Sequence, residues 1–181
     1  MLTAAHCIGT TDPSLITITA GVHNKNSNEL ATRQVRKIEK IFVHPEYNAQ
    51  TTTNDITILR LAEPVQFNKY VQPACLPGPE PQPDEDVILI GWGSLALGAQ
   101  AYHTLKEAKL KVVGKCNKYW PQYNEEKQIC VANSVTGDSA CQGDSDGPML
   151  YQRDGKWIVS GIASFVSSRG CITDSTSQPN V

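Results

Sequence analysis

The segment CQGDSDGP, residues 141–148, sets one serine between two aspartates in a stretch of turn-forming residues. A serine hydroxyl is a weak nucleophile until a base removes its proton, and that base is usually a histidine oriented by a carboxylate. Ser145 is therefore a candidate nucleophile, and the alternative is a polar turn with no chemical role. The histidines and acids elsewhere in the chain bear on this choice.

One of the four histidines differs from the others in its surroundings. His6 follows small residues in TAAHC and precedes Cys7. Asp55 leads directly into the apolar run ITILRL, where an acid is either a strand-start residue or a carboxylate held at the edge of a core. Taken alone, both are more simply interpreted as structural residues. Solvent exposure is expected for the three histidines that lie in polar segments, His23, His44 and His103.

Short segments rich in β-branched residues, separated by turn residues, predict an all-β chain. No long amphipathic helix is expected. Only 105–113 offers a helical alternative, and Val112, Val113 and Gly114 favour a strand there. The expected strands are LITITAGV (15–22), QVRKIEKIFV (34–43), DITILRL (55–61), DVILIGWG (86–93), LKEAKLKVV (105–113) and KWIVSGIASFV (156–166).

A proline-rich segment separates these strands into two groups. Residues 72–86, QPACLPGPEPQPDED, hold five of the eleven prolines. Because proline cannot donate a hydrogen bond to a β-ladder, this segment is expected to be an extended surface connector. It divides the chain into two β-rich halves.

Four blocks of the sequence, taken in order, resemble signature segments of the chymotrypsin-like (trypsin family) serine proteases: TAAHC, NDITILRL, IGWG and CQGDSDGP. A lone GDSxG would be a weak indication, whereas four ordered blocks span nearly the whole chain. The resemblance implies an all-β fold of two antiparallel β-barrels with the active site in the cleft between them. Residues 1–181 would form one partial protease domain. Within it, 1–71 is the remnant of the first barrel, 72–86 the connector and 87–181 the second barrel.

The resemblance also sets expectations about the ends of the domain. Relatives begin with a strand upstream of the histidine block, and they end with a further strand and a helix. We therefore expect a domain truncated at both ends. Its cysteines indicate an oxidising compartment, so we expect a secreted, extracellular protein whose signal peptide is absent from this sequence.

The resemblance implies a Ser-His-Asp triad in which His6 is the general base, Asp55 orients it and Ser145 attacks the substrate. The backbone N–H groups of Gly143 and Ser145 would form the oxyanion hole. Asp144 would form an ion pair with an amino group that activation sets free.

The pocket positions implied by the resemblance favour small or medium apolar substrate side chains. The residue six before the nucleophile is Ser139, whereas an enzyme that cleaves after Lys or Arg would carry a buried carboxylate there. Val166 stands where relatives with deep pockets have glycine, and it should narrow the pocket. The other substrate-binding positions are Ser164, Phe165 and Asn180. Ser164 also matches the serine that supports the triad aspartate, with an ordinary strand serine as the alternative.

Six scattered cysteines, without CxxC or zinc-site spacing, indicate disulfides rather than a metal site. The resemblance implies the bridges Cys116–Cys130 and Cys141–Cys171. Cys7 would pair with a cysteine upstream of this sequence, and Cys75 would be free or pair in the same way.

One departure from the family pattern lies beside the nucleophile. Relatives carry glycine where Asp146 stands, which lets the backbone turn tightly. Aspartate is among the residues that best tolerate unusual backbone angles, so the fold is expected to survive. A carboxylate near His6 and Ser145 could still misalign the loop or hold His6 protonated. The alternative function is therefore a catalytically inactive homologue that acts as a binding or regulatory protein.

Composition excludes several other classes. The net charge of −2 over 181 residues gives no polyanion-binding surface, so no nucleic-acid partner is expected. No apolar run approaches the roughly 18 residues of a membrane span, so no membrane association is expected. Val22 and Thr32 stand where calcium-binding relatives carry carboxylates, and we expect neither a metal nor another cofactor. The expected partners of a monomeric enzyme are polypeptide substrates and protein protease inhibitors.

Overall fold

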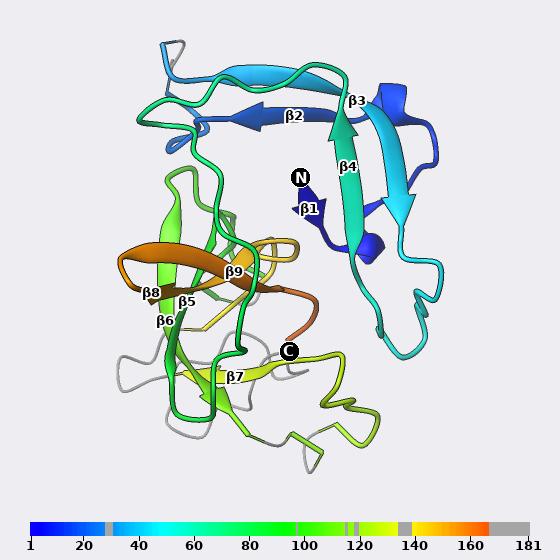
Figure 1. The fold of residues 1–181 in the computed structure, drawn as a ribbon, viewed down its shortest axis with the longest axis vertical. Coiled ribbons are helices and arrows are strands. Elements are labelled where there is room, and N and C mark those ends of the chain that lie inside the picture. Colours follow the sequence, from blue (N-terminus) through cyan, green and yellow to red (C-terminus); the bar gives the residue numbers. More distant parts are fainter. Residues whose placement is uncertain (28–30, 97, 115, 118–119, 134–138, 167–181) are drawn as a thin grey trace.

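Two antiparallel sheets make up most of the regular secondary structure of the described residues. The structure is a computed structural model that describes residues 1–27, 31–96, 98–114, 116–117, 120–133 and 139–166. Within these residues the regular elements are nine β-strands and two short 3-10 helices, η1 (Ala5–Cys7) and η2 (Pro13–Leu15). The first sheet lies above the second in the view of Figure 1. No helix of the described part of the chain is long and apolar enough to span a bilayer.

The first sheet has the strand order β1-β4-β3-β2. In β4 the buried residues Thr57 and Leu59 alternate with the exposed residues Ile58 and Arg60, because successive side chains of a strand point to opposite faces. One face of β4 therefore packs into the interior of the protein. The strands of this sheet are β1 (Leu2–Thr3), β2 (Thr17–Ala20), β3 (Gln34–Val43) and β4 (Thr57–Leu61).

The second sheet has the strand order β7-β6-β5-β8-β9 and carries the main hydrophobic cluster. Its strands are β5 (Asp86–Gly91), β6 (Lys106–Val113), β7 (Cys130–Asn133), β8 (Pro148–Arg153) and β9 (Lys156–Ile162). Full burial of one large aliphatic side chain stabilises a fold by about 1.5–3 kcal/mol, so this cluster anchors the sheet. Its buried members are Val87, Leu89, Leu110, Val112, Val131, Ala140, Met149 and Tyr151.

The proline-rich segment 72–86 runs from the first sheet to the second, as Figure 1 shows. Most of it is exposed, and it pairs with β9 at one point. The N–H of Cys75 donates to the carbonyl of Trp157 at 3.0 Å, and the carbonyl of Cys75 accepts from the N–H of Val159 at 3.0 Å. Further along, the Tyr151 hydroxyl donates to the carbonyl of Pro79 at 2.9 Å. The segment is an extended surface strap, and the residue boundaries of the two predicted halves stay predictions.

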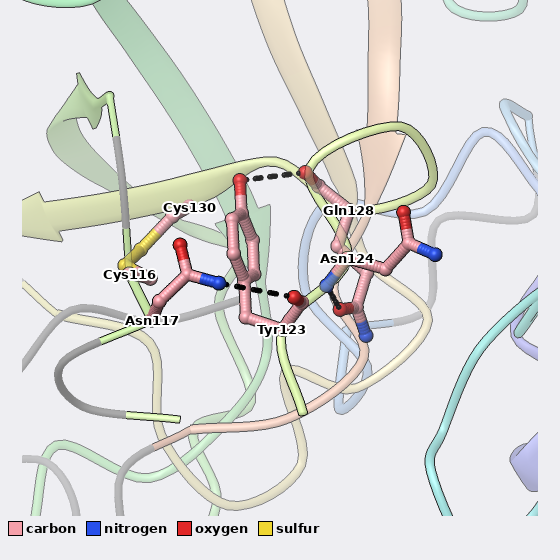
Figure 2. The surroundings of a disulfide bond; sticks show 6 residues. All are labelled: Cys116, Asn117, Tyr123, Asn124, Gln128 and Cys130. Carbon is pink, nitrogen blue, oxygen red and sulfur yellow. Dashed lines mark hydrogen bonds between the residues drawn. A yellow bond between two sulfur atoms is a disulfide. The ribbon is translucent and has the colours of Figure 1, made fainter. Parts of the chain in front are cut away.

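A disulfide joins Cys116 to Cys130 at the start of β7, and this is one of the two expected pairings. Figure 2 shows the hydrogen bonds around it. The Tyr123 hydroxyl donates to the carbonyl of Gln128 at 2.9 Å, and the Asn117 amide donates to the carbonyl of Tyr123 at 3.4 Å. The bridge and these bonds tie residues 116–117 to residues 123–130.

The expected all-β fold is confirmed, and each of the six expected strands contains an observed strand. Segment 34–43 is a strand over its whole length, and 106–113 is a strand rather than a helix. Three strands were not predicted: β1, β7 and β8. β1 has only two residues, and β8 opens with a proline. In the structure Pro148 is the first residue of β8, where a strand tolerates proline best.

A two-residue turn joins β8 to β9. Arg153 pairs with Lys156, and the residues between them, Asp154 and Gly155, have φ values of 52° and 72°. Positive φ at both central residues matches the twist of the flanking strands, which is why Asp-Gly suits this turn.

Replacing Gly155 with alanine is expected to lower the free energy of unfolding by about 1 kcal/mol, because a Cβ is costly in left-handed backbone. The added methyl group would meet nothing within 4 Å, so the loss reports the backbone alone. Gly78→Ala is the matched control, since its methyl group also enters open space and its φ is not in the left-handed region. Chemical denaturation measures both variants, and equal losses would contradict this account of the turn.

Candidate active site

Strand pairing brings His6 and Asp55 together. β1 and β4 are antiparallel, with Thr3 opposite Thr57. Residues that follow β1 therefore lie beside residues that precede β4. His6 lies in η1, directly after β1, and Asp55 lies two residues before β4.

The carboxylate of Asp55 holds His6 through two contacts. Oδ1 accepts a hydrogen bond from the backbone N–H of His6 at 2.8 Å, and Oδ2 lies 2.7 Å from Nδ1 of the imidazole. Oδ2 also accepts the hydroxyl of Ser164, which follows β9 in the second sheet. The side chain of Asp55 is 4% exposed, against 31% for His6. A buried carboxylate at Nδ1 favours the tautomer with its proton on Nδ1 and leaves Nε2 as a hydrogen-bond acceptor.

Ser145 lies in residues 141–147, which precede β8 and form the serine segment. Ala163, directly after β9, holds this segment in place. The N–H of Asp146 donates to the carbonyl of Ala163 at 2.9 Å, and the N–H of Ala163 donates to the carbonyl of Gly147 at 2.8 Å. Ser164 is the next residue along, so the hydrogen bonds that hold the serine segment also bring Ser164 to Asp55. The three predicted triad residues thus come from both sheets.

Ser145 and His6 are not hydrogen-bonded to each other in the described structure. Nε2 of His6 lies instead 3.4 Å from Sγ of Cys7, which is a free and exposed cysteine, as Cys75 also is. Burial raises the pKa of the Cys7 thiol, and the nearby carboxylates of Asp146 and Asp55 raise it further. Cys7 is therefore a neutral thiol at physiological pH and a weak hydrogen-bonding partner for Nε2.

Two backbone N–H groups beside the nucleophile, those of Gly143 and Ser145, have no acceptor among the described residues. Neighbouring N–H groups do make hydrogen bonds. That of Asp144 donates to the carbonyl of Cys141, and that of Gly147 donates to the carbonyl of Asp144, both at 3.0 Å. The φ of Gly143 is 89°, in the left-handed region that favours glycine. Unused N–H groups on such a turn are available to bind an anion.

Backbone groups enclose the carboxylate of Asp144. Oδ1 accepts from the N–H of Gly93 at 2.8 Å, and Oδ2 accepts from the N–H of Cys141 at 3.0 Å. A Cβ on Gly93 would lie 2.4 Å from the carboxyl carbon, which explains the glycine at the end of IGWG. Burial raises the pKa of Asp144, and the two N–H groups oppose that rise. The ion pair expected of Asp144 stays a prediction.

Asp146 occupies left-handed backbone, with φ at 71°. Aspartate tolerates this conformation better than most residues. Its Oδ2 accepts a hydrogen bond from the hydroxyl of Thr3 at 3.3 Å. Although the residue as a whole is exposed, desolvation of the carboxyl group raises its pKa. The hydrogen bond from Thr3 and the charges of His6 and Lys25 oppose that rise.

A cavity of about 990 Å³ opens beside Ser145. Apolar side chains of the second sheet, such as Leu89, Leu110 and Met149, line much of it, and Val166 also packs against the main hydrophobic cluster. A lining of this kind suits an apolar ligand side chain. The predicted site residues that line the cavity are Asp55, Asp144, Ser145, Ser164, Phe165 and Val166.

Three other predicted site residues, His6, Ser139 and Gly143, lie outside this lining. The Ser139 hydroxyl donates to the carbonyl of Ala140, which lines the cavity. Cys141 takes part in a disulfide, as expected. Its predicted partner Cys171 and the predicted pocket residue Asn180 lie outside the described residues.

Sequence reasoning missed two side chains at the site. Trp120 packs edge-on against Phe165, with ring centroids 5.6 Å apart, and no motif indicates this contact. Thr3 is 4% exposed and donates to Asp146. Its place between a short strand and small residues could have indicated a buried hydroxyl in need of an acceptor.

The groups gathered here are a hydroxyl, an imidazole held by a carboxylate, and two unused N–H groups. Together they suit nucleophilic attack coupled to proton transfer. In the part of the chain that the structure describes, no three His, Cys, Asp or Glu side chains are grouped as metal ligands.

Comparison with known proteins agrees with this chemistry. A family model described as Trypsin matches residues 1–181. Chymotrypsin-like elastase family member 1 of Homo sapiens is 36% identical over 179 residues, and that of Macaca fascicularis is 35% identical over 179 residues. Each match covers 94% of this chain, and 68% and 66% of the respective relative. The chain thus spans about two thirds of the length of these relatives.

Two further proteins extend the comparison. Transmembrane protease serine 9 of Rattus norvegicus is 31% identical over 170 residues, which is 91% of this chain and 16% of that protein. The solved structure titled "Structure of GrC" has a TM-score of 0.83 and 31% sequence identity. That match covers 99% of this chain and 75% of the other, so the similarity extends over the whole described fold.

Asp146→Asn is expected to raise the melting temperature more at pH 7 than at pH 4. The pKa of Asp146 is raised in the folded protein, so the folded state binds the proton more tightly than the unfolded state. The wild type is therefore destabilised as the pH rises through that pKa, and the amide removes this cost. Thermal unfolding across this pH range measures the effect. Asp154→Asn, at an exposed turn, is the control, and a pH-independent difference at position 146 would contradict the prediction.

Proposed function

Because this chain belongs to the trypsin family, we propose that it is a serine endopeptidase that uses His6, Asp55 and Ser145 as its triad. Its fold is that of the trypsin-like serine proteases. The observation that carries the proposal is the carboxylate of Asp55, which contacts both the backbone N–H and Nδ1 of His6. This arrangement leaves Nε2 free of a proton and able to accept one.

In the proposed reaction the Ser145 hydroxyl gives its proton to Nε2 of His6 as Oγ attacks the carbonyl carbon of a peptide bond. The carbonyl oxygen becomes an anion bound by the N–H groups of Gly143 and Ser145. The imidazolium then protonates the departing amine, which leaves an ester on Ser145. Water, deprotonated by His6, hydrolyses that ester and restores the serine. Hydrogen bonds of this kind often tighten only when substrate binds, which accounts for the missing contact between His6 and Ser145.

The proposed primary specificity is for small or medium apolar side chains before the cleaved bond. Phe165 and Val166 contribute apolar surface to the cavity beside Ser145. Ser139, at the base of the proposed pocket, offers a hydroxyl rather than a carboxylate. A cationic side chain would then lack a counter-charge there, and its burial would be costly.

The proposal includes the setting in which the enzyme works. Its partners would be polypeptide substrates and protein inhibitors that occupy the same cavity, and it would act outside the cell as a monomer. Asp144 would pair with an amino group that activation sets free, and that ion pair would fix the loop that carries Gly143 and Ser145.

A second candidate function is that of a catalytically inactive homologue that binds partners through the same surface. The observation that favours it is Asp146, which sets an extra carboxylate near His6 and Cys7. In that case the site would bind polypeptides without cleaving them.

A fluorophosphonate probe separates the two functions. We expect the full-length, activated protein to be labelled on Ser145, and Ser145→Ala to abolish labelling, because only an activated serine attacks the phosphorus atom. His6→Ala should slow labelling by about 10²–10⁴-fold, the usual contribution of a general base. Ser14→Ala removes an exposed serine that does not line the cavity and should label like the wild type. Equal labelling of wild type and Ser145→Ala would overturn the enzyme proposal.

A library of peptide substrates tests the proposed pocket. We expect cleavage after alanine, valine and leucine to be at least about tenfold faster, in kcat/KM, than cleavage after lysine or arginine, since burial of an unpaired charge costs more than 1.4 kcal/mol. Ser139→Asp should shift the preference toward lysine and arginine. A wild-type preference for basic residues would refute the proposed specificity.

A further inference from the structure

The proposed reaction has no use for the carboxylate of Asp146. The family pattern calls for glycine at this position, and the φ of 71° is a conformation that glycine adopts most easily. An aspartate here accepts a backbone cost, and its side chain extends from the residue next to the nucleophile. Its contacts therefore indicate what that side chain does.

The backbone and the side chain of Asp146 bind to opposite sheets. Its N–H donates to the carbonyl of Ala163, directly after β9 of the second sheet, at 2.9 Å. Its carboxylate accepts the hydroxyl of Thr3, in β1 of the first sheet, at 3.3 Å. The residue thus connects the two sheets beside Ser145.

Thr3 is a firm anchor for this contact. It is 4% exposed and is paired with Thr57 in the antiparallel ladder of β1 and β4. Only Ala4 and Ala5, both buried, separate it from His6. A shift of Thr3 would therefore be transmitted to the imidazole through a short, packed stretch of backbone.

The charged and titratable groups around the Asp146 carboxylate are also placed to hold it. His6 and Lys25 attract it, and the Cys7 thiol feels its charge together with that of Asp55. Lys25 is itself fixed over the ring of Trp92, at 5.1 Å from the ring centroid. The carboxylate therefore has a hydroxyl donor and the cationic side chain of Lys25 near it, which favour its position against Thr3.

We propose that Asp146 is a positioning residue: its hydrogen bond with Thr3 links the serine segment to β1 and so sets the distance between Ser145 and His6. The proposal rests on the proposed protease function. With glycine in this turn, only the backbone would align Ser145 with His6, whereas the Asp146–Thr3 hydrogen bond adds a side-chain contact that aligns them. Because small misplacements near the reacting atoms cost large factors in rate, loss of the link should appear in kcat.

Four variants test the link. Thr3→Val removes the hydroxyl at nearly constant volume, and Thr3→Ser keeps it. Asp146→Gly restores the family residue and removes the carboxylate. Thr57→Val is the matched control, since Thr57 is a buried threonine on the neighbouring strand whose hydroxyl has no hydrogen-bond partner among the described residues. Thermal unfolding first establishes that each variant is folded.

With peptide substrates we expect Thr3→Val and Asp146→Gly each to lower kcat by about tenfold, the value of one hydrogen bond, with KM within about twofold of the wild type. Thr3→Ser should restore most of kcat, and Thr57→Val should leave both constants unchanged. A general loss of stability would not separate serine from valine at position 3 in this way. If Asp146→Gly raises kcat above the wild type, Asp146 acts as a brake and the proposal is wrong.

Amide hydrogen exchange tests the Asp146–Thr3 link independently of the proposed protease function. If the link exists, Thr3→Val should speed exchange of the Asp146 and Gly147 amides by about tenfold, and Thr3→Ser should not, whether or not the protein cleaves peptides. Faster exchange without any fluorophosphonate labelling would leave the link standing and end the protease proposal. Labelling with unchanged exchange in Thr3→Val would end the link and leave the protease proposal standing.

Discussion

The buried carboxylate of Asp55 is the constraint on which the rest of the site depends. A carboxylate that is 4% exposed is costly unless donors surround it. Here the donors are the N–H and Nδ1 of His6 and the hydroxyl of Ser164. Two of them come from the turn after β1 and one from the end of β9, so both sheets must be in place before the charge is satisfied. The contacts with His6 also orient its imidazole. The three contacts therefore stabilise the fold and prepare the proposed chemistry at the same time.

The serine segment contains two energetically unfavourable features, desolvated carboxylates and left-handed backbone. Desolvation raises the pKa of both Asp144 and Asp146, so each carboxylate would be more easily ionised in water than in the fold. Asp146 also stands in left-handed backbone, as does Gly143. Strain and buried charge collect at functional sites because the surrounding structure can hold them there. Ala140 and Met149, which flank this segment in the sequence, belong to the hydrophobic cluster of the second sheet, and that cluster supplies the support.

The sequence predicted the fold class far better than the contacts at the candidate site. β-branched segments such as 34–43 pack onto a pleated surface, and that preference is local, so it is readable from residues alone. β8 was not predicted; it begins with Pro148, and a proline at the first position of a strand leaves the ladder intact. The hydrogen bond from Thr3 to Asp146 spans 143 residues, and no local pattern encodes such a contact. The contact between the rings of Trp120 and Phe165 is not encoded locally either, because it depends on how the fold places two distant chain segments.

Polar contacts join the two sheets around the site. The Ser164–Asp55 and Asp146–Thr3 bonds cross from one sheet to the other, and the amide of Gln128 donates to the carbonyl of Thr52 at 3.3 Å nearby. Apolar packing is nondirectional and tolerates small sliding movements, whereas a hydrogen bond fixes both distance and angle. A site whose nucleophile and base belong to different sheets needs the second kind of contact. On this reasoning the unusual aspartate beside Ser145 adds to a set of directional bonds that hold His6 and Ser145 in register, and the main hydrophobic cluster holds the second sheet together.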